Sequence, residues 1–256
     1  MYMGKDTKRQ LKSLKKWLVP EIEYRMGFRS GGAIDYKHVP VVINNFNRLT
    51  MLLKLIDSLE TRGYDNLYII DNASSYPPLM DWYRHCKYPV FMLNRNVGHL
   101  AVWETGLYKM FTDTYFVYTD ADMEISPECP DDFMEYFIRL LRRYPKALKC
   151  GFAIRIDDLP DSFDNKQQVI EWESQFWEHE LEPDVYNAPI DTTFAVYKPF
   201  FKGETVDFND LYIRSGFPYT IRHLPWYADS DNLSDEDRYY LSHIRTSTHW
   251  SEKEKK

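Results

Sequence analysis

Two carboxylates one residue apart, Asp120 and Asp122, directly follow a short run of β-forming residues at 115–119. Alternate residues of an extended chain point the same way, so both carboxylates can face one point just beyond the strand. In an open α/β sheet that is where ligands bind. Two mutually repelling carboxylates favour a divalent cation with oxygen ligands, Mg²⁺ or Mn²⁺. The alternative is structural: the aspartates open a turn or cap a helix near Pro127.

Polar residues also follow three earlier strand-like segments. Apolar runs at 39–44, 67–70 and 88–93 each end in polar residues, and helical patterns separate them. This alternation predicts an α/β fold with a mostly parallel central sheet and helices on both faces. The residues that would then line one edge of the sheet are Asn45, Asp71, Asn96 and Asp120.

The second half of the chain is less regular. Its patterns predict helices at 133–144 and 169–181, strands at 147–156, 192–197 and 219–224, and a helix at 239–244. We expect a main domain at 38–228. It follows a basic helical extension at 1–37 and precedes an acidic and charged tail at 229–256, which we expect to be partly disordered.

Composition excludes some classes of protein. The 256 residues carry a net charge of −7, which argues against a nucleic-acid binder. Cys86, Cys129 and Cys150 have spacings that suit neither a disulfide framework nor a zinc site. The N-terminus lacks the apolar core of a signal peptide, and no run is long enough to span a membrane. We therefore expect a cytoplasmic protein.

The basic extension at 1–37 permits two interpretations. Its lysines alternate with a narrow apolar stripe that includes Leu11, Leu14 and Trp17. The segment could lie on an anionic membrane at the inner face, as a peripheral contact. The shortness of the stripe favours the other interpretation, a helix packed on the domain with its lysines solvated.

Missing loop motifs narrow the choice of nucleotide enzyme. The chain has no P-loop motif and no G-x-S-x-G elbow. The first loop, 44–48, contains no glycine, which a dinucleotide-binding site would need for a close approach to pyrophosphate. Any bound nucleotide would therefore have its diphosphate held by a metal.

Four motifs, 40–48, 69–74, 94–98 and 119–122, together resemble family 2-like glycosyltransferases with the GT-A fold. The resemblance implies a nucleoside diphosphate sugar donor and inversion at the anomeric carbon. It implies nucleotide contacts by Asn45 and Asp71, a metal site at Asp122 and Asp120 with Asp120 also near the ribose, and further donor contacts by Arg48 and Asn96.

In the second half, GT-A relatives often supply a histidine as a third metal ligand, and His223 is the best match, with His249 second. The acidic pair that many relatives carry on a late helix is missing. Asp191 is our first choice as the base that activates the acceptor hydroxyl, with Asp157 and Asp158 as runners-up. The acceptor would be a carbohydrate or a lipid-linked carbohydrate, as in polysaccharide synthesis. The alternatives are a sugar-nucleotide nucleotidyltransferase and a non-catalytic nucleotide- or carbohydrate-binding relative.

Overall fold

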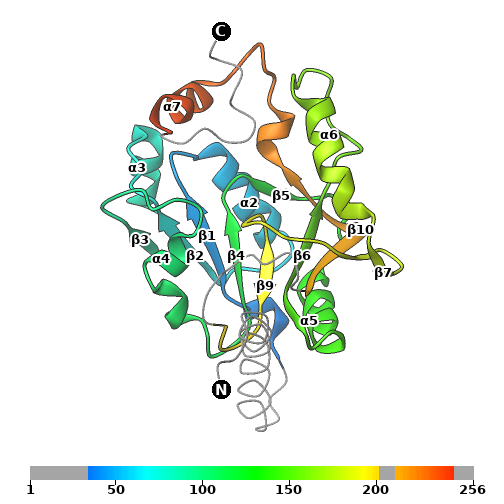
Figure 1. The fold of residues 1–256 in the computed structure, drawn as a ribbon. Coiled ribbons are helices and arrows are strands. Elements are labelled where there is room, and N and C mark those ends of the chain that lie inside the picture. Colours follow the sequence, from blue (N-terminus) through cyan, green and yellow to red (C-terminus); the bar gives the residue numbers. More distant parts are fainter. Residues whose placement is uncertain (1–33, 202–210, 245–256) are drawn as a thin grey trace, which may run out of the picture.

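A ten-stranded sheet runs through the computed structural model, which describes residues 34–201 and 211–244 (Figure 1). The strand order is β3-β2-β1-β4-β9-β6-β10-β8-β7, and β5 pairs with β10 beside this path. The strands are β1 Val41–Asn45, β2 Leu67–Asp71, β3 Val90–Met92, β4 Phe116–Asp120, β5 Met123–Ile125, β6 Ala147–Ile154, β7 Glu180–Glu182, β8 Val185–Asn187, β9 Ala195–Tyr197 and β10 Leu211–His223.

The first four strands are mutually parallel, so their polar ends meet at one edge of the sheet. In this register Asn45 lies opposite Asp71, and Asn44 lies opposite Asp120. The sequence therefore predicted correctly which residues share this edge on β1, β2 and β4.

A single antiparallel strand, β9, joins this half to the other half of the sheet. It pairs with β4 on one side and with β6 on the other, antiparallel to both. As a result β6 runs in the direction of β4 again, and β10 is parallel to β6. The sheet is thus mostly parallel in strand direction, which confirms the predicted fold class.

Helices cover both faces because successive strand residues point to opposite sides. Val41 and Ile43 belong to one hydrophobic core, and Val42 between them belongs to another. Helices α2, α3, α5 and α6 contribute to the first core, whereas α4 and η3 contribute to the second. The helices are η2 Tyr36–His38, α2 Thr50–Glu60, α3 Pro77–Tyr83, α4 Ala101–Glu104, η3 Leu107–Met110, α5 Phe133–Arg143, α6 Lys166–Ser174, η4 Gln175–Trp177, η5 Leu224–Tyr227 and α7 Asp235–His243.

Two predicted elements have different bounds, and one further helical segment is interrupted. The segment between β3 and β4 is broken at Gly106, whose φ of +75° is left-handed and ends α4 before η3 begins. The helix expected at 169–181 stops at Ser174 and continues only as η4. The last strand starts at Leu211, well before residue 219, and it carries a register irregularity between Ser215 and Thr220.

The last described helix, α7, lies at the polar edge of the sheet where β1 and β2 end. In Figure 1, α7 lies beside α3, next to the loops that follow β1 and β2. No helix in the described ranges is long and apolar enough to cross a membrane. Residues 1–33 and His249 lie outside the described residues, so the membrane contact expected of the extension stays a prediction.

Candidate active site

Asp120 is fixed by residues from two other segments. Thr192 Oγ1 donates a hydrogen bond to Asp120 Oδ2 at 2.5 Å, and Asn44 Nδ2 donates to Oδ1 at 3.4 Å. The backbone N–H of Asp120 also donates to the carbonyl of Thr192 at 2.8 Å. The carboxylate therefore stands between the end of β1 and the loop that precedes β9.

His223 meets Asp122 although 100 residues separate them in the sequence. It is the last residue of β10 and pairs with Met123 of β5, and the N–H of Leu224 donates to the carbonyl of Asp122 at 2.8 Å. His223 Nε2 lies 3.5 Å from Asp122 Oδ2. Asp122 Oδ1 and His223 Nδ1 are buried with no hydrogen-bond partner. Two unsatisfied buried polar atoms on touching side chains are typical of a site that takes a ligand.

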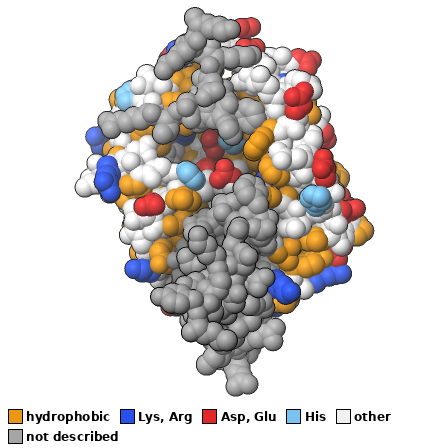
Figure 2. Space-filling model, viewed as in Figure 1, with side chains coloured by type: hydrophobic (Ala, Val, Ile, Leu, Met, Phe, Trp, Pro, Cys, Tyr) orange, Lys and Arg blue, Asp and Glu red, His pale blue; other side chains and the backbone are white. Residues whose placement is uncertain are grey.

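The pKa values of Asp120 and Asp122 are shifted in opposite directions. Burial and the neighbouring charge of Asp122 hold the pKa of Asp120 well above its ordinary value. Burial also opposes ionisation of Asp122, but His223 and Arg48 more than offset it, so the pKa of Asp122 is lowered. One ionised carboxylate is thus stable here, whereas ionising the second is unfavourable because the two charges repel. A bound cation would reduce this repulsion. Figure 2 shows acidic side chains near the centre of this face with histidine side chains beside them.

The donor set suits a hard divalent cation. Carboxylate oxygens with one imidazole nitrogen are ligands that Mn²⁺ and Mg²⁺ accept, and Asp122 Oδ1 has no other partner. Within 34–201 and 211–244, however, no three His, Cys, Asp or Glu side chains converge as a complete metal site. The fold brings Asp122 and His223 into contact, and Asp122 lies close enough to Asp120 for its charge to raise the pKa of Asp120, after the larger effect of burial.

Asn45 and Asp71 form a buried polar pair at the tips of β1 and β2. Asn45 Nδ2 donates to the Tyr83 hydroxyl at 2.9 Å, and Asp71 Oδ2 accepts from the N–H of Ser74 at 2.9 Å. The remaining side-chain oxygen of each, Oδ1, has no hydrogen-bond partner. Two unpaired acceptors side by side are suited to a ligand that presents N–H or O–H groups.

Arg48 is held by α7. Its Nη1 pairs with Asp237, and its guanidinium lies over the Tyr240 ring, 3.8 Å from the centroid. The same charge lowers the pKa of Asp122, so Arg48 acts on the carboxylate site from the first loop. Sequence reasoning named Arg48 but missed Asp237 and Tyr240. The Ser234–Asp237 spacing of the capping box was the available signal for the start of this helix.

Asn96 lies apart from the other predicted residues. It is exposed, and its Oδ1 accepts the N–H of Gly98 at 2.8 Å within its own loop. Asn72 connects that loop to the site: its Oδ1 accepts the N–H of Val97 at 2.8 Å, and its Nδ2 donates to the Gly98 carbonyl at 2.7 Å. In the sequence, the signal for this role of Asn72 was its position as a polar residue directly after Asp71.

Asp191 is exposed and directly precedes Thr192, whose hydroxyl binds Asp120. Its Oδ1 accepts the N–H of Thr192 at 2.9 Å, and its charge contributes to the raised pKa of both Asp120 and Glu173. Beneath it lies a buried ion pair that sequence reasoning missed. Glu173 of α6 pairs with Arg214 of β10, both side chains are 3% exposed, and Arg214 Nε donates to the carbonyl of Pro189 at 2.7 Å. This pair supports the segment that carries Asp191.

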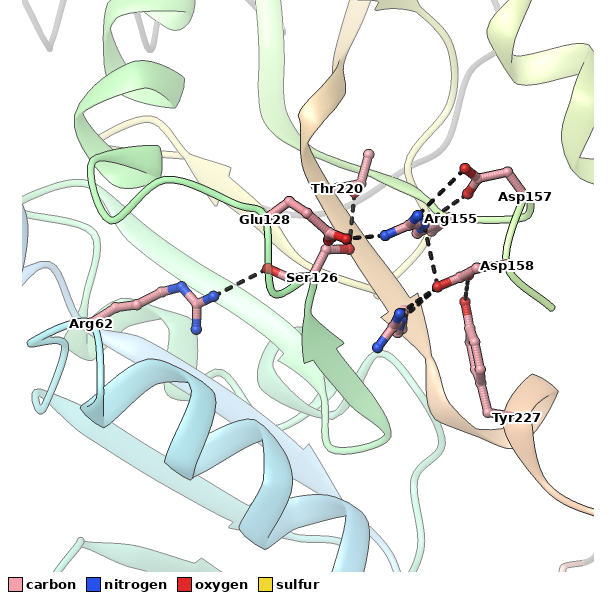
Figure 3. A network of polar contacts seen from close by, with 9 residues as sticks. Arg62, Ser126, Glu128, Arg155, Asp157, Asp158, Thr220 and Tyr227 are labelled. Atoms are coloured by element: carbon pink, nitrogen blue, oxygen red, sulfur yellow. Dashed lines mark hydrogen bonds and ion pairs between the residues drawn. The ribbon is translucent and has the colours of Figure 1, made fainter. Parts of the chain in front are cut away.

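Asp157 and Asp158 are both engaged in a network of arginines (Figure 3). Arg155 Nε donates to Asp157 at 2.7 Å, and Asp158 accepts from Arg222 and from the Tyr227 hydroxyl. The pKa of Asp158 is lowered: burial opposes ionisation, but Tyr227 and Arg222 outweigh it. Asp191 therefore remains the better candidate for a base.

Comparison with known proteins places the chain in a family. Among solved structures, the chain is similar to GalNAc-T7 with UDP, GalNAc and Mn²⁺ (TM-score 0.49, 12% identity, 87% of this chain and 53% of that one). It is also similar to S. aureus TarS 1–349 (TM-score 0.35, 14% identity, 49% and 39%). The chain thus spans about half or less of the length of these proteins. No curated protein sequence matches it.

The sequence matches glycosyl transferase family 2 over residues 41–198, which is more than half of the chain and includes Asp120, Asp122 and Asp191. The chain therefore belongs to glycosyl transferase family 2.

Proposed function

We propose that the chain transfers a sugar from a nucleoside diphosphate sugar to an acceptor hydroxyl, with Mn²⁺ or Mg²⁺ held by Asp122, Asp120 and His223. The observation that carries the proposal is the contact of His223 with Asp122, because two separate segments bring an imidazole nitrogen to within 3.5 Å of a carboxylate whose other oxygen is buried and unpaired. Family membership supports the reaction class.

The donor would bind along the edge formed by β1, β2 and β4. The unpaired acceptors of Asn45 and Asp71 suit the N–H and hydroxyl groups of a nucleoside. Arg48, fixed by Asp237, provides positive charge near the diphosphate position. When bound, the divalent cation would stabilise the negative charge of the leaving nucleoside diphosphate.

Asp191 would act on the acceptor. Its carboxylate takes the proton of the acceptor hydroxyl as that oxygen bonds to the anomeric carbon. The bond from this carbon to the diphosphate oxygen breaks, and its electron pair leaves with the nucleoside diphosphate. Attack from the side opposite the leaving group inverts the anomeric centre. The exposure of Asp191, one residue before the Thr192 that binds Asp120, supports this role.

The acceptor class follows from the reaction type: a carbohydrate hydroxyl, free or on a lipid carrier, as in polysaccharide synthesis. A cytoplasmic location with peripheral membrane contact through 1–37 is part of the same proposal, since such acceptors gather at membranes. A lipid-linked acceptor that is used better on vesicles than in detergent would support it.

A thermal-shift screen of nucleoside diphosphates with and without Mn²⁺ tests the proposal. We expect one nucleotide to raise the melting temperature only when Mn²⁺ is present, because a ligand that binds the folded chain stabilises it. Asp122→Asn should lose this Mn²⁺-dependent shift and turnover of the donor. The matched control is Asp161→Asn, which removes one charge from a fully exposed side chain. A Mn²⁺-dependent shift that persists in Asp122→Asn would refute the metal site.

A further inference from the structure

The segment from Arg222 to Tyr227 is tied at both ends to one carboxylate. Arg222 Nε donates to Asp158 Oδ2 at 2.9 Å, with a second bond from Nη2 to the same oxygen. The Tyr227 hydroxyl donates to the other oxygen, Asp158 Oδ1, at 2.5 Å. Asp158 therefore bridges the end of β10 and the end of η5.

His223 and Trp226 lie between these two ties. Consecutive residues of a strand point to opposite faces, so Arg222 turns toward Asp158 while His223 turns toward Asp122. The rings of His223 and Trp226 are in edge contact, with centroids 4.7 Å apart. His223 Nδ1 has no hydrogen-bond partner. No side-chain hydrogen bond at Nδ1 orients the imidazole, so its place depends on the segment that carries it.

The rest of the network anchors Asp158 itself. Arg155 Nε lies 3.3 Å from Asp158 Oδ2, and the backbone N–H of Arg155 donates to the Ile221 carbonyl at 2.8 Å. Arg155 Nη1 also donates a hydrogen bond to Glu128 Oε2 at 2.9 Å (Figure 3). The carboxylate of Asp158 is thus the central member, and Glu128 is peripheral.

We propose that Asp158 is a positioning residue for the metal ligand His223, which it holds against Asp122 through Arg222 and Tyr227. This inference rests on the metal-assisted function proposed above. It assigns a task to a carboxylate that contacts neither donor nor acceptor. Outer partners of metal ligands typically affect metal affinity by about 10–100-fold. We expect the lower end, about tenfold, because Asp158 acts through the backbone and not on the imidazole itself.

The test compares Asp158→Asn and Tyr227→Phe with the control Glu128→Gln in the full chain. Tyr227→Phe removes only one of the two ties and serves if Asp158→Asn does not fold. Two readouts are used. The first is the ring signal of His223 in the metal-free, ¹³C-histidine-labelled protein, assigned with His223→Gln. The second is Mn²⁺ affinity, together with the nitrogen modulation of the bound Mn²⁺ in pulsed EPR.

We expect the His223 ring signal to shift or broaden in both test variants, with about tenfold weaker Mn²⁺ binding and reduced nitrogen modulation in Asp158→Asn. Glu128→Gln should match the wild type in all of these. A wild-type ring signal and wild-type Mn²⁺ affinity in the test variants would overturn the inference, as would equal effects in Glu128→Gln. If the wild-type chain shows no Mn²⁺ binding, the metal role in the proposed function fails, and the ring signal still decides whether Asp158 positions His223.

Discussion

At the residue scale, the site is built from short polar motifs that the sequence displays and from long-range contacts that it hides. Asp120 and Asp122 were predictable because they stand together after a strand. The contact of Asp122 with His223 depends on how β10 returns to β5, a pairing between segments nearly 100 residues apart. The Glu173–Arg214 pair has no local pattern at all, because a buried ion pair looks in sequence like two solvated charges.

The proposed base gives the first residue-scale prediction. Asp191→Asn should lower transfer by about 10²–10⁴-fold, since the amide cannot take the acceptor proton. Donor binding, measured by calorimetry with Mn²⁺ present, should stay unchanged because Asp191 is placed on the acceptor side. Asp157→Asn is the control, since that carboxylate is exposed and paired with Arg155. Near-normal transfer by Asp191→Asn would assign the proton to another group.

The buried ion pair of Glu173 and Arg214 gives the second residue-scale prediction. Arg214→Met leaves the buried carboxyl of Glu173 without its ion-pair partner, and such a change typically costs about 3–5 kcal/mol of unfolding free energy. The double variant Glu173→Leu with Arg214→Met removes both charges and should recover most of the loss. Urea denaturation at neutral pH measures both. A double variant as unstable as the single one would mean that packing around Phe176, and not the unpaired charge, sets the cost.

The pH dependence of the single variant provides a further check. Burial raises the pKa of Glu173, and Arg214 opposes that rise, so removing Arg214 should raise the pKa further. The folded variant then retains a proton that the unfolded chain releases above the ordinary value of 4.5. Its unfolding free energy should therefore fall as the pH rises above that value. The difference in unfolding free energy between variant and wild type should be smaller at roughly pH 5 than at roughly pH 8.

At the element scale, α7 is a structural partner of the segments that follow β1 and β2. Glu236 is buried and accepts hydrogen bonds from the N–H and Oγ1 of Thr50 at the start of α2. The Tyr239 hydroxyl donates to Ser75 at 3.0 Å, beyond β2. The N-cap of α2, Leu49, offers no capping side chain, so Glu236 supplies the cap from a distant helix. A helix was expected near here, but its acidic residues suggested only a solvated tail.

Removing this remote cap should loosen α2. Glu236→Ala leaves the N–H of Thr50 without its partner, and losing a helix cap costs about 0.5–2 kcal/mol. Hydrogen exchange at the first turn of α2 should speed up, and thermal melting should shift downward. The control is Asp235→Ala on the same helix, whose side chain is 96% exposed. Equal effects from the two variants would show that α7 stabilises through helix content alone.

At the scale of the whole molecule, the fold class and the family resemblance were predictable, and both are confirmed. Regular alternation in 39–120 fixed the parallel half, because each strand and helix there has a clear period. The second half was harder. Strands β5, β7 and β8 have three residues each, too few for a pattern, and β9 enters between β4 and β6 through tertiary pairing that no local motif indicates.

The junction of the two halves depends on Gly151. A Cβ there would lie 2.0 Å from the carbonyl oxygen of Phe194 and 3.0 Å from Cα of Ala195. Both are backbone atoms, the first directly before β9 and the second in it. Gly151→Ala should therefore push β9 from β6 and cost at least the roughly 1–3 kcal/mol typical of overpacking. Because β9 follows Asp191 and Thr192, whose hydroxyl holds Asp120, we also expect weaker Mn²⁺-dependent nucleotide binding than in the wild type. Denaturation and calorimetry on the same variant measure the two effects. A stable Gly151→Ala chain with normal binding would show that the two halves of the sheet tolerate separation, and that the site does not depend on their close approach.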